Sequence, residues 1–122
     1  MDLLILRMII LLYTQVPTTT IQHWGWYQSA SEDQQHRYRV YCGRNGSEPH
    51  WDLMRLAWSS VAKVAIAPYQ DVLGLDSSGR MNIPGLSQNN WTWRAKELPQ
   101  HLANRLRFFT EAYGRLPEQQ DR

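Results

Sequence analysis

The sequence has one cysteine in 122 residues, no block of like charge, and no apolar run approaching the roughly 20 residues that a membrane span needs. Cys42 alone cannot close an internal disulfide, which excludes a disulfide scaffold and fits a reducing, cytoplasmic compartment. We interpret it as an inert structural thiol. Thirteen basic and eleven acidic residues give a net charge of +2, so neither nucleic acid nor an anionic membrane surface is indicated as a partner.

The first thirteen residues are apolar except for Asp2 and Arg7. A secretory signal begins with positive charge and continues as an uninterrupted apolar stretch, and both charged residues break that pattern. The segment therefore predicts a buried strand or a short helix, with a membrane anchor as the alternative.

Two helices are predicted in the middle of the chain from their end signals. Ser31 can cap a helix that begins with two acidic residues and ends at Gly43, near Tyr41. Pro49 suits the first position of a second helix, which we expect to end near Ala62. The apolar face of that helix consists of Trp51, Leu53, Met54, Ala57, Trp58 and Val61.

A buried strand and a third helix are predicted in the second half. Residues 64–67 form a short apolar run before Pro68, which is typical of a strand buried on both faces of a parallel sheet. Residues 71–85 are rich in glycine, serine and proline and predict a loop. A last helix is expected to begin near Pro99 and to end at Tyr113 and Gly114.

This order of helix, strand, loop and helix predicts an α/β fold class, as the C-terminal piece of a (β/α)8 TIM barrel. In such barrels the loops after the strands build the active site, which would place residues 69–93 over the chemistry and the helices outside. A last barrel strand pairs with strands that this chain lacks. We therefore expect the piece to be incomplete on its own, and poorly soluble or molten without them.

Several short strings carry a family resemblance in their order and spacing. They resemble the C-terminal part of 4-alpha-glucanotransferases (amylomaltases, glycoside hydrolase family 77). The strings are GWYQSAS at residues 25–31, WDLMRLA at 51–57, SSVA at 59–62, QDVLGL at 70–75, RMNIPG at 80–85 and NWTWR at 90–94. The resemblance covers residues 25–114, and we expect residues 115–122 to form a disordered polar tail.

The resemblance implies transfer of a 1,4-alpha-glucan segment to the 4-position of an acceptor, with retention of configuration. Such a reaction uses a carboxylate nucleophile and a carboxyl group that acts first as acid and then as base. By resemblance both lie upstream of this chain, so we assign no catalytic residue and predict that the chain alone is inactive. Carboxylates that qualify by residue type only are Glu32, Asp33, Glu48, Asp52, Asp71 and Asp76.

The resemblance also implies which residues meet substrate. Arg80, Asn82, Pro84 and Gly85 would lie near the donor and acceptor sugars, with alpha-1,4-glucans and maltooligosaccharides as ligands and no cofactor. Without the resemblance, turn geometry is the favoured explanation of the Met-Asn-Ile-Pro-Gly sequence at residues 81–85. Among the tryptophans we expect Trp26, Trp91 and Trp93 to pack rather than to stack on sugars. The four histidines lack metal-ligand spacing with Cys42, so no metal is predicted and surface positions explain them.

Residues 1–24 depart from the family pattern, which there reads YTGTHDNDTTLGW. A coding sequence for GTHDNDTTLG, read one base late, can give VPTTTIQHW, which is the run from Val16 to Trp24. We hypothesise that residues 1–24 are an out-of-frame translation, and that the N-terminal fragment of the same split enzyme is a partner. A divergent in-frame segment is the alternative, and the genomic sequence upstream of Met1 distinguishes the two.

Two other classes of function remain open from the sequence. A non-catalytic glucan-binding module would use exposed aromatic residues without carboxylates. A small membrane-associated protein would use residues 1–13 as its anchor.

Overall fold

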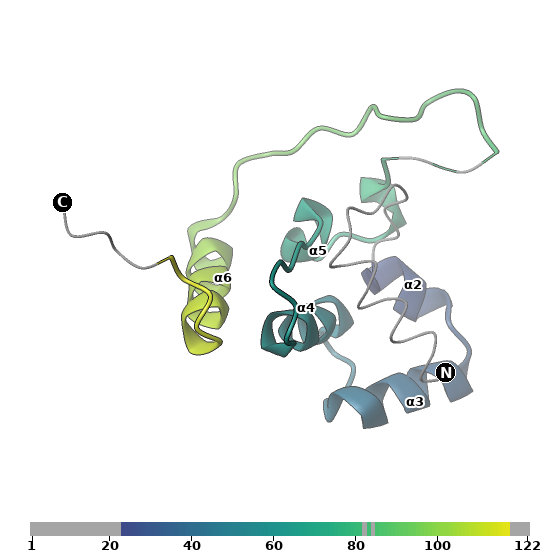
Figure 1. Cartoon of the computed structure of the whole chain (residues 1–122). Coiled ribbons are helices and arrows are strands. Elements are labelled where there is room, and N and C mark those ends of the chain that lie inside the picture. Colours follow the sequence, from purple (N-terminus) through teal and green to yellow (C-terminus); the bar gives the residue numbers. More distant parts are fainter. Residues whose placement is uncertain (1–22, 82, 84, 118–122) are drawn as a thin grey trace.

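The computed structural model describes residues 23–81, 83 and 85–117, which form five α-helices and one 3-10 helix (Figure 1). The predictions for residues 1–22 lie outside the described residues. Within the described ranges there is no strand, and no helix combines the length and apolar character that crossing a bilayer requires. The elements are α2 (His23–Ser29), α3 (Glu32–Cys42), α4 (Pro49–Ser59), α5 (Tyr69–Leu73), η1 (Ser77–Gly79) and α6 (Gln100–Ala112).

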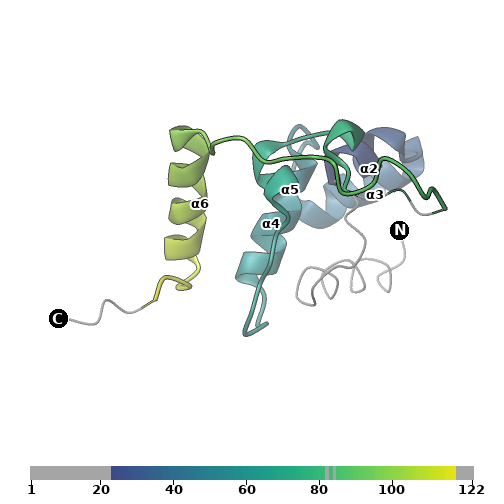
Figure 2. The same ribbon diagram turned by 90° about the horizontal axis from the view of Figure 1, so that it is seen from above.

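Helix α4 is the centre of the arrangement. It contacts α2, α3, α5 and α6, and α6 also contacts α5. Figures 1 and 2 show α6 beside α4, on the side away from α2 and α3, at the end of a long connection that follows η1. The fold is therefore a helical cluster whose last helix is joined through residues 80–99.

Helix α3 forms where its end signals predict it. The Ser31 hydroxyl accepts a hydrogen bond from the Gln34 N–H, and the Gln34 side chain accepts one from the Ser31 N–H, which completes a capping box. At the other end Gly43 adopts a left-handed conformation (φ 64°), and its N–H closes the last turn on Arg39 and Val40. This prediction is confirmed.

Helix α4 begins at Pro49 as predicted but ends at Ser59, earlier than the expected end near Ala62. Ser60 is already extended, and its hydroxyl returns to the carbonyl of Ala57 at 2.8 Å. This side-chain bond satisfies a free carbonyl at the helix end and competes with continuation of the helix.

The predicted strand at residues 64–67 is absent, so the α/β class is wrong for the described residues. A strand is stabilised by hydrogen bonds to neighbouring strands, and no described segment provides them. Val64 and Ile66 are consequently exposed rather than buried on two faces. Residues 69–73 and 77–79 are helical; the first of these helices begins before the predicted 71–85 loop, and both interrupt it.

The last helix matches its prediction, since Pro99 precedes α6 and Gly114 follows it in a left-handed conformation (φ 67°). Helix α2 was not predicted, because its seven residues carry no end signal. Arg115, which we placed in the tail, is bound to the end of α4, and residues 118–122 lie outside the described residues.

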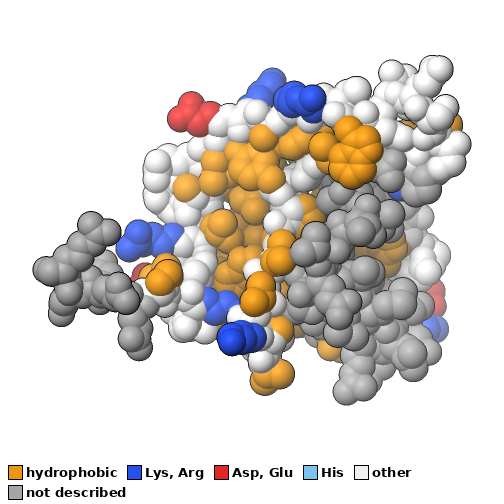
Figure 3. Space-filling model, turned by 45° about the horizontal axis from the view of Figure 1, so that its top comes forward, with side chains coloured by type: hydrophobic (Ala, Val, Ile, Leu, Met, Phe, Trp, Pro, Cys, Tyr) orange, Lys and Arg blue, Asp and Glu red, His pale blue; other side chains and the backbone are white. Residues whose placement is uncertain are grey.

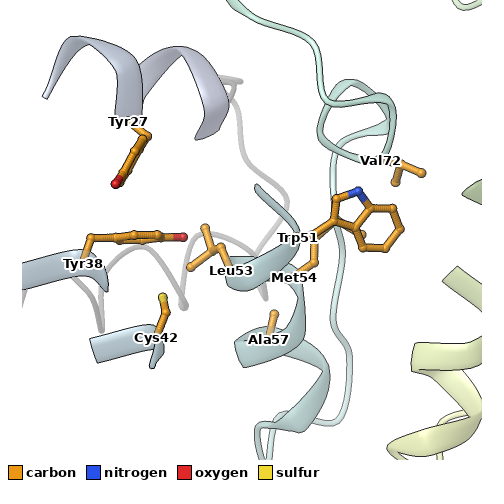
Figure 4. Close-up of a cluster of buried hydrophobic side chains, with 8 residues drawn as sticks. All are labelled: Tyr27, Tyr38, Cys42, Trp51, Leu53, Met54, Ala57 and Val72. Carbon is orange, nitrogen blue, oxygen red and sulfur yellow. The ribbon is translucent and has the colours of Figure 1, made fainter. Parts of the chain in front are cut away.

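The core joins α2, α3, α4 and α5 around aromatic side chains. Figure 4 shows Tyr38 lying between Tyr27 and Cys42, and Trp51 pointing toward Val72. The Tyr38 hydroxyl donates to the Pro49 carbonyl at 2.6 Å, and burial raises the pKa of that phenol. Burial also raises the pKa of Cys42 to about 11, which agrees with its interpretation as an inert structural thiol.

Two polar connections hold α6 against α4. At the start of α4, Glu48 makes a two-point ion pair with Arg105 in the first half of α6, at 2.8 and 2.5 Å, and Arg105 lies over the Trp51 ring at 4.3 Å. Near their ends, Arg115 donates to the carbonyls of Trp58, Ser60 and Ala62. Because Arg105, earlier in the chain, is bound at the start of α4 and Arg115, later in the chain, is bound at its end, α4 and α6 run in the same direction.

Candidate functional site

The predicted substrate residues belong to the 80–94 loop. Hydrogen bonds between residues of this loop hold its two sides together. The Trp91 N–H donates to the Met81 carbonyl at 2.5 Å. The Asn90 side chain accepts from the Ile83 N–H at 2.9 Å and donates to the Leu86 carbonyl at 2.7 Å. One amide side chain therefore links three parts of the loop.

The closed loop turns an aromatic side chain toward solvent. Asn89 and Trp91 both have φ of 61°, a region that asparagine tolerates and that costs a bulky residue on the order of 1–2 kcal/mol. Trp91 is 58% exposed, so the expectation that it packs is wrong. The hydrogen bond from its N–H fixes the backbone orientation that directs the indole outward.

The other two tryptophans pack as expected. Trp93 is half-buried beside Tyr69, with ring centroids 6.4 Å apart, and the Tyr69 hydroxyl donates to the Lys96 carbonyl. Trp26 packs edge-on against Tyr38 in the core at 5.6 Å. The contacts of Tyr69 with Trp93 and Lys96 attach the C-terminal end of the loop region to α5.

The structure describes two of the four predicted substrate residues. Arg80 is half-buried at the end of η1, where its N–H donates to the Ser77 carbonyl. Gly85 is exposed with φ of 86°, a conformation that favours glycine. Asn82 and Pro84 lie outside the described residues. The residue that sequence reasoning missed is Asn90, although asparagine in a turn is a known signal for such side-chain bonds.

The exposed carboxylates named by residue type serve local structure. Asp33 pairs with Arg37 at 2.9 Å, and Glu32 pairs with Arg39. Hydrogen bonding from the Ser78 side chain and from its backbone N–H lowers the pKa of Asp76. Such contacts are typical of caps and helix surfaces. They give these side chains no arrangement for acid or base chemistry.

The remaining carboxylates are less exposed than the sequence suggested. Asp52 and Asp71 are buried. Burial raises the pKa of Asp52 although Arg44, 3.4 Å away, opposes the shift. The hydrogen bonds from Arg105 lower the pKa of Glu48. Ion pairs thus engage Glu48 and Asp52, and neither is placed as a free nucleophile.

The histidines do not gather into a metal site within the described part of the chain, where no three His, Cys, Asp or Glu side chains could hold an ion. His36 and His101 are exposed as expected. His50 is only 8% exposed, so the surface assignment is wrong for it. It packs edge-on against Trp24, with ring centroids 5.8 Å apart.

Comparison with known proteins gives one consistent result. A family model described as 4-alpha-glucanotransferase matches residues 17–100. The match begins before Gly25, and the origin of residues 1–24 stays a prediction.

Curated relatives carry the same description. The 4-alpha-glucanotransferase of Synechocystis is 50% identical over 94 residues, covering 75% of this chain and 19% of the relative. That of Thermus thermophilus is 43% identical, with coverages of 75% and 20%. The chloroplastic/amyloplastic enzyme of Arabidopsis thaliana is 35% identical, with coverages of 75% and 17%. The chain thus spans about a fifth of the length of these relatives.

Proposed function

Because the chain belongs to the 4-alpha-glucanotransferase family, glycoside hydrolase family 77, we propose that it forms the C-terminal piece of a (β/α)8 barrel. The complete barrel transfers a 1,4-alpha-glucan segment to the 4-position of an acceptor glucan or glucose. This piece contributes the last helices and a substrate-facing loop.

The observation that carries this proposal is the parallel orientation of α4 and α6. The ion pair with Glu48 joins the start of α4 to Arg105 of α6, and Arg115, just after α6, is bound to the end of α4. The chain between them must therefore return to the starting side, and residues 60–68 begin that return. Parallel helices joined by a returning segment are the connectivity of a βα barrel, in which that segment is a strand.

Residues 60–68, the returning segment, expose apolar side chains of the kind that a strand buries in a sheet. Val61 is fully exposed, and Val64 and Ile66 are 54% and 37% exposed. Figure 3 shows hydrophobic side chains gathered across the middle of one face of the molecule. Exposed apolar groups of this kind favour an interface. We propose that the preceding part of the family sequence, as a separate N-terminal fragment, covers them and pairs with residues 64–67.

The 80–94 loop is the proposed contact with glucan. Arg80 and Asn82 have the guanidinium and amide groups that can bind vicinal sugar hydroxyls, and Pro84 and Gly85 complete the set of residues that the resemblance implies for this contact. The exposed indole of Trp91 adds an apolar surface on which a glucosyl ring can stack.

Catalysis needs groups from the preceding part of the enzyme. In a retaining transfer a carboxylate attacks the anomeric carbon while a carboxylic acid protonates the departing 4-oxygen. The acceptor hydroxyl then gives its proton to that same group and displaces the carboxylate. Glu48 and Asp52 are held in ion pairs here, which supports our proposal that the lone chain is inactive.

Complementation tests the proposal. The chain is co-expressed with the preceding part of a family enzyme, including its HDND motif, and glucose release from maltotriose is measured. Arg80→Ala should lower kcat/KM by about 10- to 100-fold, since a hydrogen bond to a charged group contributes roughly 1.5–3 kcal/mol. Arg80→Lys tests whether charge alone suffices. Turnover by the purified chain alone, or full activity of the Arg80→Ala complex, would contradict the proposal.

A further inference from the structure

Two residues that flank Asn90 in the 80–94 loop have a left-handed backbone. Among the residues that the structure describes, Asn89 and Trp91 are the non-glycine residues with this conformation, each with φ of 61°. Asparagine tolerates it, but a bulky residue such as tryptophan rarely adopts it. Strained backbone of this kind persists only where surrounding contacts hold it, and it clusters at sites that bind ligand. The contacts that hold Trp91 therefore indicate what the strain serves.

The backbone of Trp91 is held on both sides. Its N–H donates to the Met81 carbonyl at 2.5 Å, and its carbonyl accepts from the Arg94 guanidinium at 2.8 Å. The indole is 58% exposed, so burial of the ring offsets little of the strain. These contacts therefore fix the direction of an exposed ring rather than pack it into the core.

The side chain of Asn90 holds a turn on the other side of the loop. The Leu86 N–H donates to the Ile83 carbonyl at 3.2 Å, which closes the turn. The Asn90 amide brackets this turn, because its oxygen accepts from the Ile83 N–H at 2.9 Å and its nitrogen donates to the Leu86 carbonyl at 2.7 Å. Since Asn90 directly precedes Trp91, these two bonds also fix the point from which the strained residue starts.

We propose that Asn90 is a positioning residue, which acts on substrate binding through Trp91 and does not touch the substrate itself. Its two bonds keep Trp91 in the strained conformation that presents the indole to solvent. A ring that is already in place spares the bound state the entropy of ordering it. This role rests on the proposed contact of the 80–94 loop with glucan, whereas the positioning of Trp91 rests on the hydrogen bonds alone.

A double-mutant cycle in the complemented enzyme tests the role, with maltotriose as substrate. Asn90→Ala should raise KM about tenfold and leave kcat within about twofold, since it weakens a contact that the ground state and the transition state share. Trp91→Ala removes the ring and should raise KM by about the same factor. The double variant should match Trp91→Ala, because Asn90 has nothing left to position. Gln88→Ala, at an exposed amide of the same loop, is the matched control and should leave KM unchanged.

Amide hydrogen exchange tests the positioning without turnover. Both bonds of Asn90 join residues of its own loop, so their loss should open the loop and leave the helical cluster intact. Asn90→Ala should therefore speed exchange of the Ile83 and Trp91 amides about tenfold, with the urea midpoint and the amides of α4 unchanged. If the isolated chain gives no folded spectrum, the labelled chain is measured in complex with the unlabelled preceding part of the enzyme.

Equal KM values for Trp91→Ala and the double variant, with faster exchange confined to the loop, would support the role. KM effects that multiply to about 100-fold would overturn it, since Asn90 would then act independently of Trp91. Unchanged exchange at Trp91, or faster exchange throughout the chain, would overturn it as well. If the unmodified complex shows no turnover, the proposed function fails, and the exchange measurement still decides whether Asn90 positions Trp91.

Discussion

Replacing Arg115 by methionine should destabilise the chain far more than its position near the C-terminus suggests. The Arg115 Nε donates to the Trp58 carbonyl at 2.7 Å, and Nη2 donates to the carbonyls of Ser60 and Ala62 at 3.1 and 2.7 Å. Methionine keeps most of the aliphatic length but leaves all three carbonyls to solvent. The change therefore isolates the guanidinium.

The size of the effect follows from these three bonds. A hydrogen bond from a charged group contributes roughly 1.5–3 kcal/mol when buried, and a cation at a helix C-terminus adds about 0.3–1 kcal/mol. Because the site of Arg115 is only partly buried and water can replace some bonds, we expect a total loss of about 2–4 kcal/mol. Arg115→Lys should recover only part of it, since an ammonium is a point charge that cannot span three acceptors.

Urea unfolding followed by tryptophan fluorescence measures this loss. With a denaturant slope of about 2 kcal/mol per molar, in the middle of the usual range, the midpoint should fall by about 1–2 M. Arg107→Met is the matched control, because Arg107 is exposed on α6 without an ion pair to any described residue. If Arg115→Met unfolds within about 0.5 kcal/mol of Arg107→Met, a range typical of surface substitutions, the reasoning fails.

Three further predictions concern the core and the ion pair. Leu53→Ala, at a fully buried position, should cost about 2–5 kcal/mol in urea unfolding, and an effect below about 1 kcal/mol would mean that the core is not packed. Glu48 has its pKa lowered by Arg105, so its contribution should be present above its usual pKa of 4.5 and be lost as the pH falls below it. Burial raises the pKa of Asp52, so the pH dependence of the unmodified chain mixes the contributions of both groups. The test therefore measures the free energy of unfolding of the chain and of Glu48→Gln at pH 7 and pH 3.5. The same change in this free energy with pH in both proteins would refute the prediction. Cys42, with its pKa raised to about 11, should react with a thiol reagent at pH 8 only after urea is added, and rapid labelling of the native chain would contradict its burial.

Features encoded in neighbouring residues could be predicted from the sequence. Ser31 and Gln34 cap a helix through bonds that span three residues, and Gly43 or Gly114 ends one through its own backbone freedom. Pro49 likewise marks a helix start without reference to the rest of the chain. Such local signals gave the correct ends of α3 and the start of α4.

Features that depend on distant residues could not be predicted in the same way. Residues 64–67 have a strand composition, but strand formation needs partners that the described chain does not provide. The burial of His50 and Asp71, and the anchoring of Arg115, depend on how helices pack and leave no pattern in the sequence. Within the candidate site, Arg80 and Gly85 were named from resemblance, whereas the role of Asn90 follows only from contacts across the loop.

The contacts of Arg105 and Arg115 with the two ends of α4 couple the movement of α6 to that of α4. None of the residues of α6 is fully buried, and its apolar contact with the core is made by the partly buried Leu102, Leu106 and Phe109. Its attachments are Arg105, inside the helix, and Arg115, three residues after its last residue; Arg105 lies about 10 Å along the axis from Ala112, at 1.5 Å per residue. A helix held at two such distant points can neither pivot nor slide along its neighbour without breaking one of them. Amide exchange in α6 should therefore report the opening of α4 as well, despite the exposure of its surface.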